Sequence, residues 1–360
     1  MSQLPPIEPD LNEAAAGATR AAGTTDAQSN LELKEIEGLS QGRIVLRRFV
    51  RHRGAMISAA ILLIIVVVAF TSEGIDALGL KIPGWWHFNY TEISGIQNGG
   101  VPSWRHPFGE DSLGRDMFAV VMRGAQQSLM IVFIVGVISL VIGVIIGAAS
   151  GFFRGWIDTI LMRFTDIVLV IPLIVLTATL GRNFGARGSL ILAIVLGLAS
   201  WTALARLVRG DFLSLREREF VDAARVAGAG PWRIMMVHIL PNAIGVIIVN
   251  TTLLMSATIL TESAVSFLGF GVQFPDVSLG SVIGEYQTAF QTRPWLFFWP
   301  AAFIVIISLT INFIGDGLRD AFDPRQKRAL NKAARKAASA AREKARAAAA
   351  AQTVTEQPAQ

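Results

Sequence analysis

The sequence predicts an all-α integral membrane protein with six transmembrane helices. Two features of the composition indicate this class. Hydrophobic residues make up 52% of the chain and charged residues only 16%, whereas globular domains average about 25% charged residues. The uncharged residues also collect in long runs, and runs of this length are typical of membrane spans.

Six stretches are close to or longer than the ~20 residues that an α-helix needs to cross a ~30 Å hydrocarbon core. They are residues 54–72, 128–150 and 158–180, the stretch between Arg187 and Arg206, residues 239–261, and the stretch between Arg293 and Asp316. No apolar run precedes the first stretch, so we expect it to be an uncleaved anchor and not a signal peptide.

The distribution of Lys and Arg predicts which ends of the spans face the cytoplasm. If the N-terminus is cytoplasmic, three basic groups share that side: the arginines before the first span, those of 206–233, and the Lys and Arg residues after 318. Far fewer basic residues would then lie outside. We therefore expect both termini and the loop 209–237 to be cytoplasmic.

These features divide the chain into five parts. We expect a disordered cytoplasmic tail at 1–42, an anchor helix at 43–72, an external segment at 73–123, a membrane core at 124–317, and a basic cytoplasmic tail at 318–360. The first tail is polar and acidic, which is typical of disorder. The last is rich in Ala, Lys and Arg, and two interpretations stay open: a solvated low-complexity tail, or a helix that binds anionic lipid.

The loop between the fourth and fifth spans has more internal order than a simple connection. Asp222-Ala223-Ala224 is typical of a short helix. Gly228 indicates the end or bend of that helix, because glycine adopts conformations that other residues avoid. Pro231 fits the first position of a second short helix, where its missing N–H costs nothing. A helix-turn-helix lying at a membrane surface is a docking element.

This loop resembles the EAA loop of ABC importer permeases, in which Glu-Ala-Ala is followed by a Gly and then by Leu-Pro. Asp222 takes the place of the Glu, a conservative change, and Leu240-Pro241 matches. The resemblance implies a rigid lever that couples an ATPase to the helices, with Arg225 or Arg233 paired to acidic groups of the ATPase. The coupling residues are then Asp222, Ala223, Ala224, Arg225, Gly228, Arg233, Leu240 and Pro241.

The end of the external segment carries a second pattern. It resembles the stretch before the second span in the dipeptide/oligopeptide/nickel subfamily of ABC permeases, through His106, Pro107, Gly109, Asp111, Gly114, Arg115 and Asp116. We expect Asp and Gly to cap and turn the chain and Arg115 to pair with a carboxylate, while contact with a binding protein is a second interpretation. A metal site is disfavoured, because a single His with two Asp lacks a second ligand pair.

Polar residues within the fifth span are candidates for a translocation path. Asn250, Thr251 and Ser256 lie inside an apolar helix, and polar groups at such depth usually face a cavity or another helix. Ser and Thr also join membrane helices to one another by hydrogen bonds. The sequence therefore leaves both roles open for these three residues.

The resemblance implies a type I ABC importer permease fold and a complete assembly in the inner membrane of a prokaryote. A related permease would form a heterodimer with this chain, two cytoplasmic ATPases would bind ATP and Mg, and an external protein would deliver the substrate. The chain has no Cys and no phosphate-binding loop, so we expect no enzymatic activity, cofactor, metal or nucleic acid here. We expect peptide substrates. The alternatives are nickel or another small solute, or an ATP-independent secondary transporter.

Overall fold

The computed structural model describes residues 41–77, 80–184 and 189–322, and it is mostly helical. The two expected tails, 1–42 and 318–360, lie mostly outside the described residues. The helices are α2 (Gln41–Arg51), α3 (Arg53–Ser72), α4 (Met117–Phe153), α5 (Gly155–Val170), α6 (Leu173–Phe184), α7 (Ser189–Arg216), α8 (Glu219–Val226), α9 (Pro231–Arg233), α10 (Leu240–Phe267), α11 (Leu279–Tyr286) and α12 (Trp295–Phe322). Strands β1 (Gly74–Ala77) and β2 (Leu80–Pro83) form an antiparallel hairpin.

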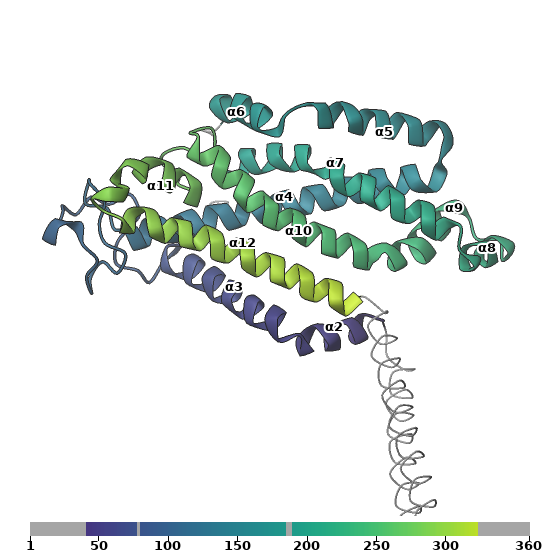
Figure 1. Ribbon diagram of the computed structural model, residues 1–360, viewed down its shortest axis with the longest axis horizontal. Helices are drawn as coiled ribbons and strands as arrows, with labels where there is room; N and C mark the ends of the chain where they lie inside the picture. The colour runs from purple at the N-terminus through teal and green to yellow at the C-terminus, as the bar shows by residue number, and fades with distance from the viewer. Residues whose placement is uncertain (1–40, 78–79, 185–188, 323–360) are drawn as a thin grey trace, which may run out of the picture.

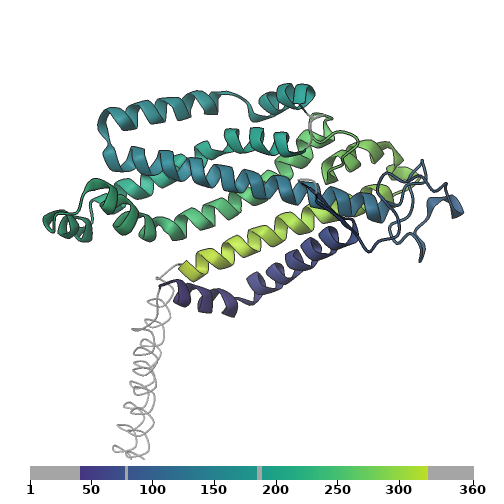
Figure 2. The same cartoon turned by 180° about the vertical axis from the view of Figure 1, so that it is seen from behind.

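Among the described residues, five helical segments are long and apolar enough to cross a membrane: α3, α4, α7, the continuous stretch from α9 through α10, and α12. A sixth span is present if α5 and α6 are counted together. The expectation of an all-helical membrane protein is therefore confirmed. The long helices lie side by side in both views, with α3 and α12 on one side and α5 and α6 on the other (Figures 1 and 2).

The third expected span, 158–180, is not one straight helix. The chain bends by 72° between α5 and α6. Ile171 is extended there, at φ −75° and ψ 116°, because the ring of Pro172 disfavours a helical conformation in the residue before it. Pro172 also lacks the N–H that would continue the α5 hydrogen bonds. The apolar run predicted one continuous span, whereas the structure divides this stretch into two helices at its proline.

Helices α4 and α7 approach closely along a row of glycines. Gly143, Gly147 and Gly151 recur every fourth residue on α4, and so they share one face of the helix. A Cβ on Gly147 would lie 2.5 Å from the carbonyl oxygen of Ala205, and one on Gly151 would lie 2.7 Å from Phe212 Cβ. Small residues of this kind allow the backbones of two membrane helices to come into van der Waals contact.

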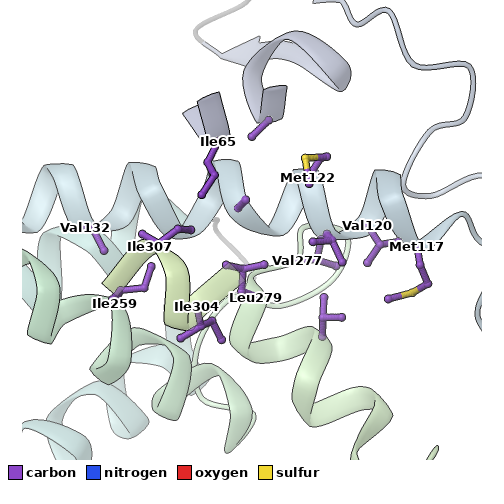
Figure 3. Packing of buried hydrophobic residues seen from close by; sticks show 14 of the residues in the cluster. Ile65, Met117, Val120, Met122, Val132, Ile259, Val277, Leu279, Ile304 and Ile307 are labelled. Carbon is purple, nitrogen blue, oxygen red and sulfur yellow. The ribbon is translucent and has the colours of Figure 1, made fainter. Parts of the chain in front are cut away.

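The opposite side of the molecule is closed by α3 and α12. A Cβ on Gly317 would lie only 2.2 Å from that of Ala55, so these two helices also depend on a glycine for their contact. Between the two sides lies an apolar core that draws on α3, α4, α10, α11 and α12. Ile65, Val132, Ile259, Leu279 and Ile307 meet in it (Figure 3).

Candidate functional site

The segment between α7 and α10 has the local structure that its sequence predicts. Helix α8 ends at Val226, Gly228 follows with φ +80°, and α9 begins with Pro231 as its first residue. A π-helical stretch, Ile234–Ile239, then leads into α10. The short helices form one end of the molecule, beyond the ends of the long helices (Figure 1). The predicted pair of helices with a bend at Gly228 is confirmed.

One face of this segment is anchored in the protein. Val221 and Ala224 of α8 belong to an apolar cluster with Phe212 of α7 and with Ile234 and Met235 of the π-helical stretch. Val221 and Phe212 are both 0% exposed. The cluster therefore joins α8 to α7 and to the beginning of α10.

The other face of the segment carries apolar side chains with little cover. Val226 is 91% exposed, Trp232 is 68% exposed, and Phe220 is 38% exposed. Large apolar groups that remain exposed together indicate an interaction surface. The tryptophan was not among the residues that the sequence singled out. Trp232 directly follows Pro231, in a loop that the sequence predicts to be a docking element. This position is the signal in the sequence that could have identified it as a candidate.

The two candidate arginines of the loop differ in their surroundings. Arg225 Nη1 lies 2.9 Å from Asp222 Oδ1, and both side chains remain well exposed. Arg233 lies on α9, is exposed, and forms no ion pair with a described residue. Ala223 is exposed, whereas Ala224 packs inward, and Leu240 and Pro241 form the first turn of α10. The eight predicted coupling residues therefore lie in one continuous segment, although only some of them are exposed.

The external signature forms a buried polar cluster at the other end of the molecule. His106 is 2% exposed, and its Nδ1 lies 2.8 Å from Asp116 Oδ1. Asp116 also caps α4 by accepting from the backbone N–H of Ala119, and it accepts a hydrogen bond from Trp86 Nε1. Gly109, at φ +82°, allows the turn between these groups. The expected capping and turning roles are present.

Arg115 is the centre of a second part of this cluster. Its guanidinium donates hydrogen bonds to Asp111, to Glu285 and to the hydroxyl of Tyr286, so the predicted pairing with a carboxylate is present. Burial alone would raise the pKa of Asp111. Asp111 accepts hydrogen bonds from the Arg115 backbone, the Tyr286 hydroxyl and the Arg115 side chain. Together these outweigh burial and lower the pKa of Asp111. Glu285 and Tyr286 belong to α11, and nothing in the sequence predicted their part.

Pro107 and Gly114 complete this region. Gly114 adopts φ +84°, and a Cβ there would lie 2.7 Å from the backbone of Gly95. Among the described residues, no group of three or more acidic, His or Cys side chains could hold a metal ion. The cluster fixes the external segment to α4 and α11.

The three path candidates of α10 lie in different surroundings. Asn250 is partly exposed and donates to the carbonyl of Val246 in its own helix. Thr251 is 8% exposed and likewise bonds within the helix, to Ile247. Ser256 is 2% exposed and donates to the carbonyl of Ser308 in α12 at 2.9 Å. Ser256 therefore has the helix-joining role that the sequence left open, and Asn250 is the most accessible of the three.

A cavity of about 340 Å³ lies where the α5–α6 bend meets α7 and α10. Its walls are mainly apolar, and its hydroxyl-bearing residues are Ser200, Thr202, Thr258 and Thr261. Pro172, which causes the bend, also lines it. Helix α10 thus lines this cavity toward one end. At its other end it begins after the π-helical stretch that follows α9.

Comparison with known proteins identifies the family. Residues 139–328 match the family described as binding-protein-dependent transport system inner membrane component. Residues 40–90 match the N-terminal transmembrane domain of oligopeptide transport permease C. The chain belongs to the binding-protein-dependent inner membrane permeases. The resemblance to ABC importer permeases drawn from its motifs is therefore confirmed, together with a multi-pass location in the inner membrane.

Relatives of this permease cover most of its length. The oligopeptide transport system permease protein OppC of Mycobacterium tuberculosis is 38% identical over 292 residues, which are 81% of this chain and 97% of the relative. OppC of Haemophilus influenzae is 36% identical over 299 residues, 82% of this chain and 93% of the relative. Among solved structures, the inward-facing MetNI methionine ABC transporter matches at 20% identity with a TM-score of 0.49, covering 57% of this chain and 98% of that one.

Proposed function

We propose that this chain is the permease subunit of an ATP-driven importer of oligopeptides. The proposal is supported by family membership and by relatives that are named oligopeptide permeases. Such a subunit hydrolyses nothing itself. It provides half of a path between two permeases, and its movement is driven by ATPases on the cytoplasmic side.

The observation that carries the proposal is the two-faced segment from α8 to α9. On its inner face, Val221 and Ala224 belong to the apolar cluster that also includes residues of α7, the π-helical stretch and α10. On its outer face, Val226 and Trp232 are exposed. An ATPase that receives the outer face would pull on both membrane helices when it closes around ATP and Mg. Arg233, which has no partner among the described residues, would meet an acidic group of that ATPase.

The remaining partners follow from the same proposal. A second, homologous permease would complete the path as a heterodimer, and an external substrate-binding protein would dock on the side of the buried His106–Arg115 cluster. Asn250 is our first candidate for contact with the transported peptide, because it is polar and partly exposed on α10. Nickel complexes or other small solutes are the alternative cargo, and selectivity between them is expected to rest mainly on the binding protein.

Purification of the tagged chain from its native membrane in mild detergent tests the assembly. We expect a second permease and two ATPases to accompany the wild type. Gly228→Arg should lose the ATPases and keep the second permease. A Cβ at Gly228 would meet nothing within 4 Å, so the arginine would add bulk to the exposed surface that we propose binds the ATPase. A homo-oligomer without ATPases would favour a secondary transporter.

Gly228→Ala is the matched control. Both variants impose about the same backbone strain of ~1–2 kcal/mol, since Gly228 has a left-handed conformation that L-residues avoid. Only the arginine adds bulk to the open face. If the alanine variant loses the ATPases as completely as the arginine variant, the bend matters and the docking face does not. Uptake of a labelled oligopeptide, compared with that of nickel, then tests the cargo.

A further inference from the structure

Helix α2 is joined directly to α3, one of the helices long and apolar enough to cross a membrane. The two helices meet at His52, which has an extended conformation of φ −82° and ψ 97° and whose Nδ1 accepts from the N–H of Ala55 to cap α3. The apolar span begins directly after this break, and its 20 residues match the thickness of the hydrocarbon core. Helix α2 lies beside the end of α12 (Figures 1 and 2). A membrane crossed by α3 would therefore have α2 at the depth of its lipid headgroups.

One face of α2 is fastened to α12. Arg48 Nη1 donates to the carbonyl of Ala321 at 3.2 Å, and His52 Nε2 lies 3.4 Å from Asp320 Oδ2. Ile44, Val45 and Phe49 are partly buried on the same side. This attachment fixes the rotation of α2 about its own axis, so the direction of its opposite face is set by the fold.

The opposite face of α2 combines a row of arginines with two exposed apolar side chains. Arg43, Arg47 and Arg51 recur every fourth residue and are all exposed. None of the three forms an ion pair with a described carboxylate. Beside this row, Leu46 is 62% exposed and Val50 is 54% exposed. A helix with an arginine row next to an exposed apolar strip is typical of helices that lie in the membrane interface.

We propose that this arginine row binds the headgroups of anionic phospholipids, while Leu46 and Val50 enter the boundary with the acyl chains. The headgroup phosphate provides the negative charge that the described part of the protein does not supply to these arginines. Arginine suits this role, because its planar fork donates two hydrogen bonds to one phosphate. A protein partner at this place would have to bring several carboxylates to the depth at which lipid phosphates already lie.

Native mass spectrometry of the purified full chain tests this proposal, with phosphatidylglycerol and phosphatidylcholine as the two probes. We expect the wild type to retain phosphatidylglycerol preferentially. Each arginine near a membrane surface contributes about fivefold to binding, so the triple variant Arg43→Gln/Arg47→Gln/Arg51→Gln should lower the affinity on the order of 100-fold. About 1 M salt should abolish the preference of the wild type, because it reduces the screening length to ~3 Å.

Arg48→Gln is the matched control, since it removes a charge from the same helix but on the face attached to α12. It should keep the lipid preference. The regions 1–40 and 323–360 are unchanged in every variant, so a difference between variants belongs to α2. The proposal is overturned if the wild type holds both lipids equally, which would result if the acidic residues before α2 neutralise the row. It is also overturned if the triple variant, with an unchanged melting temperature, retains phosphatidylglycerol as the wild type does.

Discussion

Glu262 accepts a hydrogen bond from Ser128 across the contact between α10 and α4, with 3.0 Å between the two side-chain oxygens. Both side chains are 0% exposed. The other carboxyl oxygen of Glu262 accepts from Ser266, and the Ser128 hydroxyl lies 3.3 Å from the backbone nitrogen of Leu279, at the start of α11. One buried carboxyl group therefore links three helices.

Removing this carboxyl should weaken the fold considerably. We expect Glu262→Ala to lower the free energy of unfolding by about 2–4 kcal/mol, because two buried hydroxyls lose their acceptor and a cavity remains. Glu262→Gln keeps the shape and one acceptor oxygen, so its cost should be about 1–2 kcal/mol. Thermal unfolding of the detergent-purified chain measures both. If the alanine variant is as stable as the wild type, the link does not support the packing of the three helices.

The glycine row of α4 leads to a second prediction, for which Gly210 in α7 is the control. Gly147→Ala places a Cβ 2.5 Å from the backbone oxygen of Ala205, so α4 and α7 must separate. We expect a loss of about 1–3 kcal/mol from this overpacking. Gly210→Ala, in α7, meets nothing within 4 Å and should be neutral or stabilising by up to ~1 kcal/mol. Equal melting temperatures for the two variants would contradict the close contact of α4 and α7.

Glu73, just after α3, makes stability depend on pH. Burial raises the pKa of this carboxyl to about 8; Arg123 and a backbone hydrogen bond with Tyr90 oppose the rise, and Asp116 adds to it. The pKa of Glu73 is higher in the folded protein than in the unfolded chain, because burial favours the neutral carboxyl. The folded state is therefore most stable below the unfolded-state pKa, and it loses this stability as the pH rises through the folded-state pKa. The melting temperature of the wild type should therefore fall between about pH 5 and about pH 9.

Glu73→Gln isolates this effect. The amide is neutral at every pH in that range, so the variant should show a smaller fall in melting temperature than the wild type. At the alkaline end the variant should be the more stable of the two. Parallel curves for the two proteins would assign the fall to other groups.

Local signals in the sequence predicted a large part of this architecture. Uncharged runs located the membrane segments, because a single stretch of about the length of one span carries enough hydropathy to be identified. Gly228 and Pro231 located the bend and the second helix of the α8–α9 segment, because backbone conformation is decided within a few residues. The same reasoning underestimated Pro172, whose effect on the preceding residue divided the third span.

Contacts between distant parts of the chain were beyond this reasoning. The sequence predicted that Arg115 pairs with a carboxylate, but Glu285 and Tyr286 lie far along the chain on a short helix that no apolar run indicated. For Ser256, the sequence could not decide between a path and a helix contact, because that depends on where Ser308 of α12 lies. Such contacts are set by how the helices pack.

The cluster around Arg115 gives the last prediction. Arg115 is 8% exposed and Asp111 is 0% exposed. Breaking a buried ion pair from one side leaves an uncompensated charge, so Arg115→Met should cost about 3–5 kcal/mol. Tyr286→Phe removes one hydroxyl and should cost about 1–2 kcal/mol. Hydrogen exchange should show faster exchange in 106–116 and in α11 together for the methionine variant, with the α8–α9 segment unchanged as the control region. Faster exchange in 106–116 alone would mean that Arg115 stabilises its own turn without holding the external segment to α11.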